Sequence, residues 1–277
     1  MKKVKSLGQA LLGLAVLWFS VGCEPSPTRT VKIGLVAPFE GLYRSVGYDV
    51  VFAMRLALQE YNAQRPAGSP FVELVSLDDQ ADPTLAQEQA RSLAADAQVQ
   101  VVLGHWLPET TQAAIPIYQQ AQLLLVSTAI LPDSTPQAFV QPALPDALSL
   151  ADSAQQYATA HGLAGVAFSN AGWYELAAAM HATPQTHWFA NVFASYPDAQ
   201  ALWAKNPPYV LQARLTANTP HFPSDFAQRY QDLAGNPPSA LAGFIYQLVW
   251  QIAPQLRHER ASQLEILPVE WAWVDGK

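Results

Sequence analysis

Val31-Lys-Ile-Gly-Leu-Val-Ala37 decides the fold. The stretch is almost continuously apolar and contains β-branched residues, which is typical of a strand buried on both faces of a parallel sheet. A loop with proline and glycine follows at 38–47, and apolar residues then recur at helical spacing through 50–61. These segments predict a strand followed by a helix, the repeating unit of an α/β sheet.

The same alternation continues through the first half of the chain. Further strands are predicted at 71–77, 99–103 and 123–126, with helices at 82–97 and 109–120 between them. Asp82 followed by Pro83 is typical of a helix start, because aspartate caps the first turn and proline has no N–H to leave unpaired there. Strands that alternate with helices indicate a parallel sheet with right-handed crossovers.

The segment 139–145 interrupts this alternation and predicts a bridge to a second unit. Beyond it we expect helices at 147–161, 174–182, 225–233 and 240–256, and strands at 164–168, 188–193, 209–213 and 269–274. We therefore expect two α/β lobes, of which the second is smaller and has fewer strands. Lobe one is expected at 31–140 and lobe two at 141–217, with 261–277 as a segment that could complete lobe two.

The N-terminus reads as a secretory signal. Lys2, Lys3 and Lys5 are followed by a short apolar run at 10–19 and by small residues before Cys23, too short a run for a membrane span. We expect residues 1–22 to be a signal peptide and 23–30 a short tether. The position of Cys23 resembles a bacterial lipobox, in which the cysteine receives lipid, although Ser20 stands where leucine is usual. Plain secretion with a free cysteine is the alternative.

Composition excludes several classes of function. Cys23 is the only cysteine, so neither an intramolecular disulfide nor a cysteine-based zinc site can form. Removing Lys2, Lys3 and Lys5 with the signal leaves 12 of 15 basic side chains against 22 acidic ones, a net charge of −10. A chain this acidic is not expected to bind nucleic acid. No second long apolar run follows the signal, so no other membrane span is expected.

Catalytic signatures are missing from the sequence. It contains no nucleophile elbow, phosphate-binding loop, dinucleotide fingerprint or zinc-protease motif. His105 and Glu109 stand four residues apart, but two groups do not make a metal site. Asp78 and Asp79 could act as paired carboxylates, although at the end of a strand such residues more often fix the loop backbone. We expect a protein that is not an enzyme and that holds no metal or cofactor.

Candidate ligand-binding residues follow the predicted strands, because open parallel sheets bind ligands beyond the carboxyl ends of their strands. They are Tyr43, Arg44, His105, Trp106, Thr110, Thr111, Ser127, Thr128 and, in the second unit, Trp173. Threonine hydroxyls and free N–H groups at a helix start attract anions such as carboxylates. The alternative for Thr110 and Thr111 is simple helix capping, and the alternative for Trp106 and Trp173 is core packing.

Several segments together resemble one family. They are Val31-Lys-Ile-Gly-Leu-Val-Ala-Pro38, Asp78-Asp79-Gln-Ala-Asp-Pro-Thr-Leu-Ala86, Val101-Val-Leu-Gly-His105 with Thr110-Thr111, Leu124-Leu-Val-Ser127, and the late helix at 222–230. The chain is similar in these segments to the type 1 periplasmic binding proteins, and most to the Leu/Ile/Val-binding receptors of ABC transporters. The first 115 or so residues after the signal carry most of the likeness.

The resemblance implies two flavodoxin-like (Rossmann-like) lobes with parallel sheets, joined by three crossings, with residues 218–260 returning to lobe one. It also implies a small amino-acid-like ligand between the lobes. Lobe one would bind its carboxylate through hydroxyl and N–H groups, and lobe two its amino end through an aromatic residue and an acid. This chain has Pro108 and Leu131 where hydroxyls are expected, and no clear acid follows Trp173, with Asp198 as no more than a candidate. Lobe two also lacks room for at least one strand–helix unit.

Two functions follow. The first is an extracytoplasmic, lipid-anchored solute-binding protein that delivers an amino-acid-like or carboxylate ligand to an ABC permease in the membrane. The second is a sensor or interaction lipoprotein of the same fold that has lost transport. An extracytoplasmic enzyme, a third class, is disfavoured because no nucleophile and base are paired in the sequence.

Overall fold

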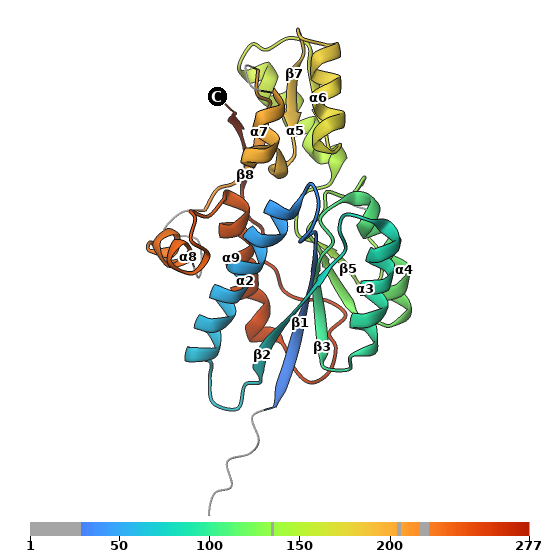
Figure 1. Cartoon of the computed structure of the whole chain (residues 1–277), viewed down its shortest axis with the longest axis vertical. Coiled ribbons are helices and arrows are strands. Elements are labelled where there is room, and N and C mark those ends of the chain that lie inside the picture. The colour runs from blue at the N-terminus through green and yellow to red at the C-terminus, as the bar shows by residue number, and fades with distance from the viewer. Residues whose placement is uncertain (1–28, 134–135, 204–205, 216–221, 277) are drawn as a thin grey trace, which may run out of the picture.

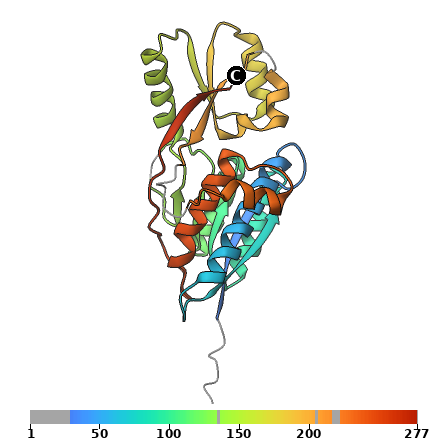
Figure 2. The same ribbon diagram turned by 90° about the vertical axis from the view of Figure 1, so that its left-hand side faces the viewer.

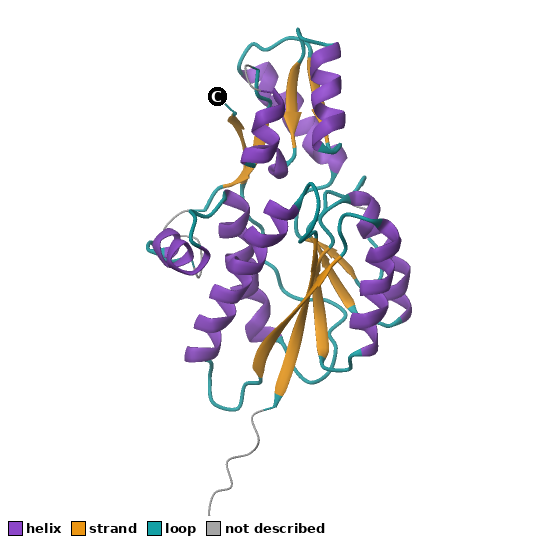
Figure 3. Ribbon diagram, in the orientation of Figure 1, coloured by secondary structure: helices purple, strands orange, loops and turns teal. Residues whose placement is uncertain are grey.

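The computed structural model describes residues 29–133, 136–203, 206–215 and 222–276. The expected signal peptide, Cys23 and most of the tether therefore lie outside the described residues. Within them, two α/β units each surround a sheet of their own (Figures 1 and 3). We refer to the unit with the five-stranded sheet as lobe one and to the unit with the four-stranded sheet as lobe two.

The sheet of lobe one is entirely parallel, as the alternation of strands and helices predicts. Its strands lie in the order β2-β1-β3-β4-β5. Their bounds are β1 Thr30–Ala37, β2 Phe71–Asp78, β3 Val99–Gly104, β4 Leu124–Ser127 and β5 Val140–Pro142. The short β5 lies inside the segment expected to be only a bridge, and it pairs with β4 before the chain leaves lobe one.

Helices cover both faces of this sheet (Figure 1). One face carries α2 (Arg44–Gln64) and α9 (Ala240–Ile252), which pack together, with α8 (Phe226–Ala234) beside α2. The other face carries α3 (Pro83–Ala95) and α4 (Pro108–Gln120), which also pack on each other. Because both faces are covered, every residue of β3 and β4 is buried, which explains why these strands are mostly apolar, with Gln100 and Ser127 as their polar members.

Lobe two contains a mixed sheet rather than an all-parallel one. Its order is β6-β7-β8-β9, with β6 Val166–Ser169, β7 His187–Ala190, β8 Tyr209–Ala213 and β9 Trp271–Asp275. The last strand is antiparallel to β8, because the chain re-enters lobe two from lobe one at the end of its course. The helices of this lobe are α5 (Ala147–Ala160), α6 (Trp173–Ala182) and the short α7 (Pro197–Trp203).

One expected strand is shorter than the sequence pattern indicates. The apolar run 188–193 predicts a strand to Phe193, but β7 ends at Ala190. The side chain of Asn191 accepts a hydrogen bond from the N–H of Phe193 and starts the 3₁₀ helix η1, Val192–Ser195. Asparagine competes with the strand for backbone hydrogen bonds in this way, so the run is divided between two elements.

The chain passes between the lobes three times. It leaves lobe one after β5, returns after β8 to form α8, α9 and the short 3₁₀ helix η2 (Ala253–Gln255), and crosses again to form β9. Figure 2 shows the last return running along one side of lobe one up to the sheet of lobe two. Three crossings are what the family resemblance implies.

Candidate functional site

The carboxyl ends of β1, β3 and β4 face lobe two, and the backbone there is tightly packed. Gly104 ends β3 with φ +138°, and a Cβ at this position would lie 2.4 Å from the carbonyl oxygen of Val36 on β1. Only glycine fits here, because residues with a side chain rarely adopt this φ and any Cβ would collide with that oxygen. Gly104 thereby turns the chain into the loop that carries His105 and Trp106.

The side chain of His105 belongs to a fully buried hydrogen-bond network. Its Nδ1 is 2.8 Å from Oδ2 of Asp79, and its Nε2 is 3.1 Å from the hydroxyl of Tyr118. Burial, reinforced by the charge of Asp79, raises the pKa of Tyr118, which keeps its hydroxyl protonated. Asp79 also accepts a bond from the N–H of Ala81. Both ring nitrogens of His105 are thus taken by the protein, and the network fastens the loop after β2 to the loop after β3.

The predicted hydroxyl residues donate to loop backbone, three of them to the loop after β3 and Ser127 to the loop after β4. Thr110 donates to the carbonyl of Leu107, and Thr111 to the carbonyls of His105 and Leu107, at distances of 2.8–3.1 Å. Thr128 donates to the carbonyl of His105 at 3.3 Å, and Ser127 to that of Ala129 at 3.4 Å. All four side chains are buried. In this structure the four hydroxyls donate to backbone carbonyls. Neither Thr110 nor Thr111 caps α4, because its N-cap is Leu107, without a side-chain hydrogen bond. The oxygen lone pairs of the hydroxyls remain as acceptors.

Aromatic side chains from both lobes meet at this edge of the sheet. Tyr43, in the loop before α2, and Trp173, the first residue of α6, have ring centroids 4.7 Å apart. The N–H of Trp173 donates to the hydroxyl of Tyr43 at 3.3 Å. Burial is the main reason that the pKa of Tyr43 is raised. Trp106 similarly lies 6.3 Å from the ring of Phe193 in lobe two.

Two indole groups in this contact have unused donors. Trp106 and Trp173 are 1% and 2% exposed, and the Nε1–H of each is buried without a hydrogen-bond partner. A buried donor without an acceptor costs about 1–3 kcal/mol. Core packing alone gives no reason to place two such donors here, where a methionine or phenylalanine would carry no penalty.

A further polar contact joins the lobes directly. Nδ2 of Asn170 in lobe two donates to the carbonyl of Ile130 in lobe one at 2.9 Å, and Asn191, also in lobe two, donates to the side-chain oxygen of Asn170. Arg44, by contrast, is exposed as the first residue of α2. The structure therefore brings Tyr43 and Trp173 together, places His105 and the hydroxyl residues beneath the contact, and leaves Arg44 at the surface.

A buried carboxylate on α2 is a feature that the sequence interpretation missed. Asp49 accepts hydrogen bonds from the hydroxyls of Tyr196, Tyr230 and Ser239, those from the two tyrosines at 2.6 and 2.8 Å. Tyr196 belongs to lobe two and the other three residues to lobe one. The signal was present in the sequence, because Asp49 falls between Val46, Val50 and Ala53 on the apolar face of the helix.

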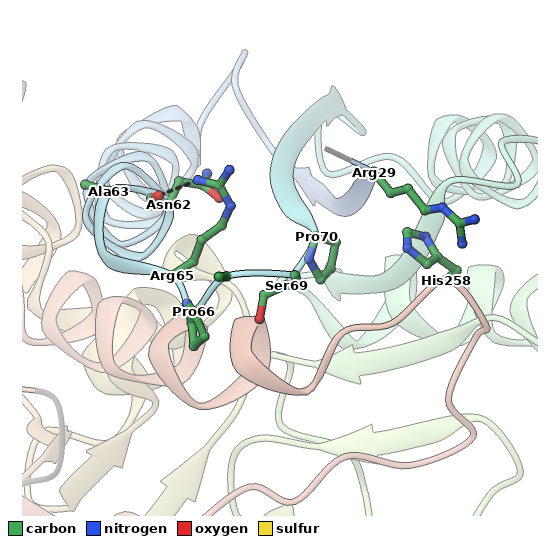
Figure 4. Close-up of a pocket in the computed structure, with 10 residues that line it drawn as sticks. Arg29, Asn62, Ala63, Arg65, Pro66, Ser69, Pro70 and His258 are labelled. Atoms are coloured by element: carbon green, nitrogen blue, oxygen red, sulfur yellow. Dashed lines mark hydrogen bonds between the residues drawn. The ribbon is translucent and has the colours of Figure 1, made fainter. Parts of the chain in front are cut away.

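Other features of the described residues do not add a reactive centre. Among them no group of three or more His, Cys, Asp or Glu side chains could hold a metal ion. No helix in the same part of the chain is long and apolar enough to cross a membrane. A hollow of about 730 Å³ lies near the amino ends of β1 and β2, away from the carboxyl ends described above. Arg29, Arg65 and His258 surround the loop after α2 there (Figure 4). It is remote from every predicted site residue.

The chain matches a known family over more than half its length. The family model described as periplasmic binding protein matches residues 30–191. None of the curated proteins compared with the chain matches it.

Solved structures with a similar fold include three solute-binding proteins. A leucine-binding protein from Thermotoga maritima has a TM-score of 0.65 at 17% identity, over 80% of this chain and 82% of that one. A branched-chain amino acid transporter substrate-binding protein from Streptococcus pneumoniae, in complex with isoleucine, has a TM-score of 0.60 at 15% identity, over 81% and 83%. An ABC-transporter solute-binding protein from Rhodopseudomonas palustris, in complex with 3,4-dihydroxybenzoic acid, has a TM-score of 0.60 at 16% identity, over 82% of each chain. At these identities the likeness establishes the fold, which agrees with the resemblance in the sequence.

Proposed function

The chain belongs to the periplasmic binding protein family, and from this premise we propose that it is the solute-binding component of an ABC importer, holding a small carboxylate or amino-acid-like ligand between its lobes. The family consists of solute-binding proteins, and its name implies an extracytoplasmic location. The Thermotoga and Streptococcus proteins of similar fold are named for leucine and branched-chain amino acids. The proposed partners are this ligand and an ABC permease in the membrane.

The single observation that carries the proposal is the pair of unused indole donors. Trp106 projects from lobe one and Trp173 from lobe two, both at the contact between the lobes, and neither Nε1–H has an acceptor. A carboxylate or carbonyl oxygen of a ligand would supply the missing acceptor. It would satisfy a donor that is already buried, so ligand binding regains free energy that the empty protein has lost.

The proposed ligand differs from a branched-chain amino acid. The two positions at which the family resemblance implies hydroxyls are Pro108 and Leu131, and neither side chain can donate a hydrogen bond. The hydroxyls of Thr110, Thr111 and Thr128 are directed to backbone carbonyls instead. With fewer hydroxyl donors and more aromatic surface, the site favours a ligand with one acidic group and an apolar or aromatic body.

Calorimetry on the full chain after signal removal tests this proposal. The ligand panel contains branched-chain amino acids, short amides, and small aliphatic and aromatic carboxylates. We expect Trp106→Phe and Trp173→Phe each to weaken binding of the best ligand by about fivefold or more, equivalent to 1 kcal/mol. Trp188→Phe is the matched control, because its Nε1 already donates to Thr183 on the outside of lobe two. Tight binding of leucine itself would contradict the argument from Pro108 and Leu131.

One observation favours the alternative, a sensor or interaction lipoprotein of the same fold. Direct bonds already join the lobes: Trp173 to Tyr43, Asn170 to Ile130 and Tyr196 to Asp49. Such bonds could hold the lobes together without a ligand. Absence of binding across the whole panel, with no ligand in native mass spectra of the purified protein, would favour this alternative.

We further propose that Cys23 anchors the protein through lipid. The proposal rests on the basic, apolar and small-residue order of residues 1–22 and on the position of the cysteine directly after them. Cys23→Ala should abolish labelling by a fatty-acid analogue and release the protein from the membrane fraction or block its processing. Since the chain has no other cysteine, labelling that persists in the variant would refute the anchor.

A further inference from the structure

A second hollow lies between the lobes, on the side of α2, and it contains neither of the unpaired indoles. It encloses about 510 Å³, within the range typical of small-molecule sites. Four aromatic side chains line it together with prolines: Tyr48 and Phe52 from α2, Tyr196 from lobe two, and Tyr230 from α8. Asp49 also lines this hollow and is only 7% exposed.

The charge of Asp49 is not neutralised by the part of the chain that the structure describes. Its three side-chain donors, Tyr196, Tyr230 and Ser239, are neutral hydroxyls, and within those residues no Lys, Arg or His forms an ion pair with it. No basic side chain lines the hollow either, although the guanidinium of Arg55 lies 5.9 Å from the ring centroid of Phe52. A buried carboxylate is normally paired with a cation or bound to a metal, because desolvation of a lone charge is costly. The hollow therefore has an electrostatic preference for a positive occupant.

The hydrogen bonds of Asp49 restrict what kind of cation fits. Burial, reinforced by the charge of Asp49, raises the pKa values of Tyr196 and Tyr230, so both hydroxyls stay protonated and keep donating to the carboxylate. With the hydroxyl and N–H of Ser239 they occupy the four or so acceptor positions that a carboxylate offers. An occupant therefore gains little from N–H groups of its own.

We propose that this hollow is a binding site for a small methylated ammonium ion. A tertiary or quaternary ammonium carries positive charge with few or no N–H donors, and aromatic faces around an anionic group are the surroundings that recognise it. Its charge offsets that of Asp49, and its methyl groups pack against Tyr48, Phe52 and Tyr196. The lining of this site includes neither Trp106 nor Trp173, although the ring of Tyr196 lies 6.5 Å from that of Trp173, and the proposal does not rest on the ligand site at the two indoles.

Titration of the full chain after signal removal, by calorimetry or NMR, tests the site with three matched probes. They are choline, ethanolamine (the same skeleton with an N–H-bearing ammonium) and 3,3-dimethylbutan-1-ol (the neutral shape of choline). We expect choline to bind at least tenfold more tightly than either of the others. Equal binding of the neutral alcohol, or no saturable binding of choline at millimolar concentration, would overturn the proposal.

Single substitutions test whether choline binds in this hollow. Tyr48→Ala removes one aromatic wall from a side chain that is 49% exposed and outside the Asp49 hydrogen bonds, so the fold should be preserved. We expect it to weaken choline binding at least fivefold. Tyr174→Ala, at a tyrosine 59% exposed on α6, is the matched control and should change nothing. Asp49→Asn should weaken binding further if the variant folds. Choline binding that survives Tyr48→Ala but is lost in Trp173→Phe would place the cation between the indoles and refute the separate site.

Discussion

The central strands of lobe one and the edge strand β6 of lobe two differ sharply in burial. In lobe one, every residue of β3 and β4 is buried, whereas in lobe two no residue of β6 is fully buried. Lobe one has a separate apolar cluster between its sheet and α3 and α4, which includes Val102 and Leu125. The buried apolar residues of lobe two all belong to the larger cluster, which also contains the α2 and α9 face of lobe one. Lobe one thus has a core of its own, and the core of lobe two is continuous with it.

The largest expected effect on the free energy of unfolding comes from replacing a buried valine of the lobe-one sheet, compared with a half-buried valine of the lobe-two sheet. Val102 on β3 is 0% exposed, while Val166 on β6 is half-buried. We expect Val102→Ala to lower the free energy of unfolding by about 3 kcal/mol, since it removes buried methyl groups and leaves a cavity. Val166→Ala should cost about 1 kcal/mol, because water already reaches part of the side chain. Urea denaturation of both variants measures the difference, and equal costs would contradict the contrast between the lobes.

The next largest expected effect is the loss of stability when a tyrosine hydroxyl that donates to Asp49 is removed at the junction of the lobes. Tyr196 and Tyr230 both donate to Asp49, but only Tyr196 does so across the two lobes. Loss of one donor to a charged group costs about 2 kcal/mol, so Tyr196→Phe and Tyr230→Phe should destabilise the chain to a similar extent. Only Tyr196→Phe should also increase hydrogen exchange of α6 and α7 relative to lobe one. Equal exchange in the two variants would show that the Asp49 cluster does not couple the lobes.

Sequence reasoning was most accurate where burial is complete. The central strands of lobe one read as nearly continuous apolar runs, so the strands at 31–37, 99–103 and 123–126 and the helix cap at Asp82 were predictable, and the structure confirms them. The short β5 was not predicted. In lobe two the half-buried strands give a weaker pattern, and the run at 188–193 conceals the cap at Asn191 that ends β7. The strand predicted at 269–274 is present as β9, but its antiparallel direction could not be predicted, because periodicity says nothing about strand direction.

The site was predictable only in part for a related reason. The position of polar and aromatic residues after each strand follows from the topology of the sheet, and Tyr43 and Trp173 do meet there. Which partner each hydroxyl selects depends on loop geometry, and the sequence does not reveal that Thr110 and Thr111 turn to backbone carbonyls. The sequence shows Asp49 as a charged residue on an apolar helix face. Its partners Tyr196, Tyr230 and Ser239 could not be predicted, because they lie 147–190 residues further along the chain.

The smallest expected effect concerns one surface ion pair in each lobe. In lobe one, Nζ of Lys32 lies 2.7 Å from Asp96, and the hydrogen bond from Lys32 is the main reason that the pKa of Asp96 is lowered from 3.8. A lowered pKa in the folded state means that ionised Asp96 stabilises the fold above about pH 4, and that this contribution is lost as pH falls further. The side chains are 20% and 33% exposed, so solvent screening limits the effect of Asp96→Asn to about 0.5–1 kcal/mol at pH 7.

In lobe two the corresponding pair is Arg214 with Glu270, whose side chains are 61% and 71% exposed. Glu270→Gln should leave the free energy of unfolding unchanged within error, because water competes for both charges. Urea titrations of both variants at pH 7 and pH 3 separate the two cases. The difference between wild type and Asp96→Asn should shrink at pH 3, because the carboxyl is largely protonated in the unfolded chain below its ordinary pKa of 3.8. A larger loss from Glu270→Gln than from Asp96→Asn would reverse the comparison and show that lobe two depends on its surface charges rather than on the core it shares with lobe one.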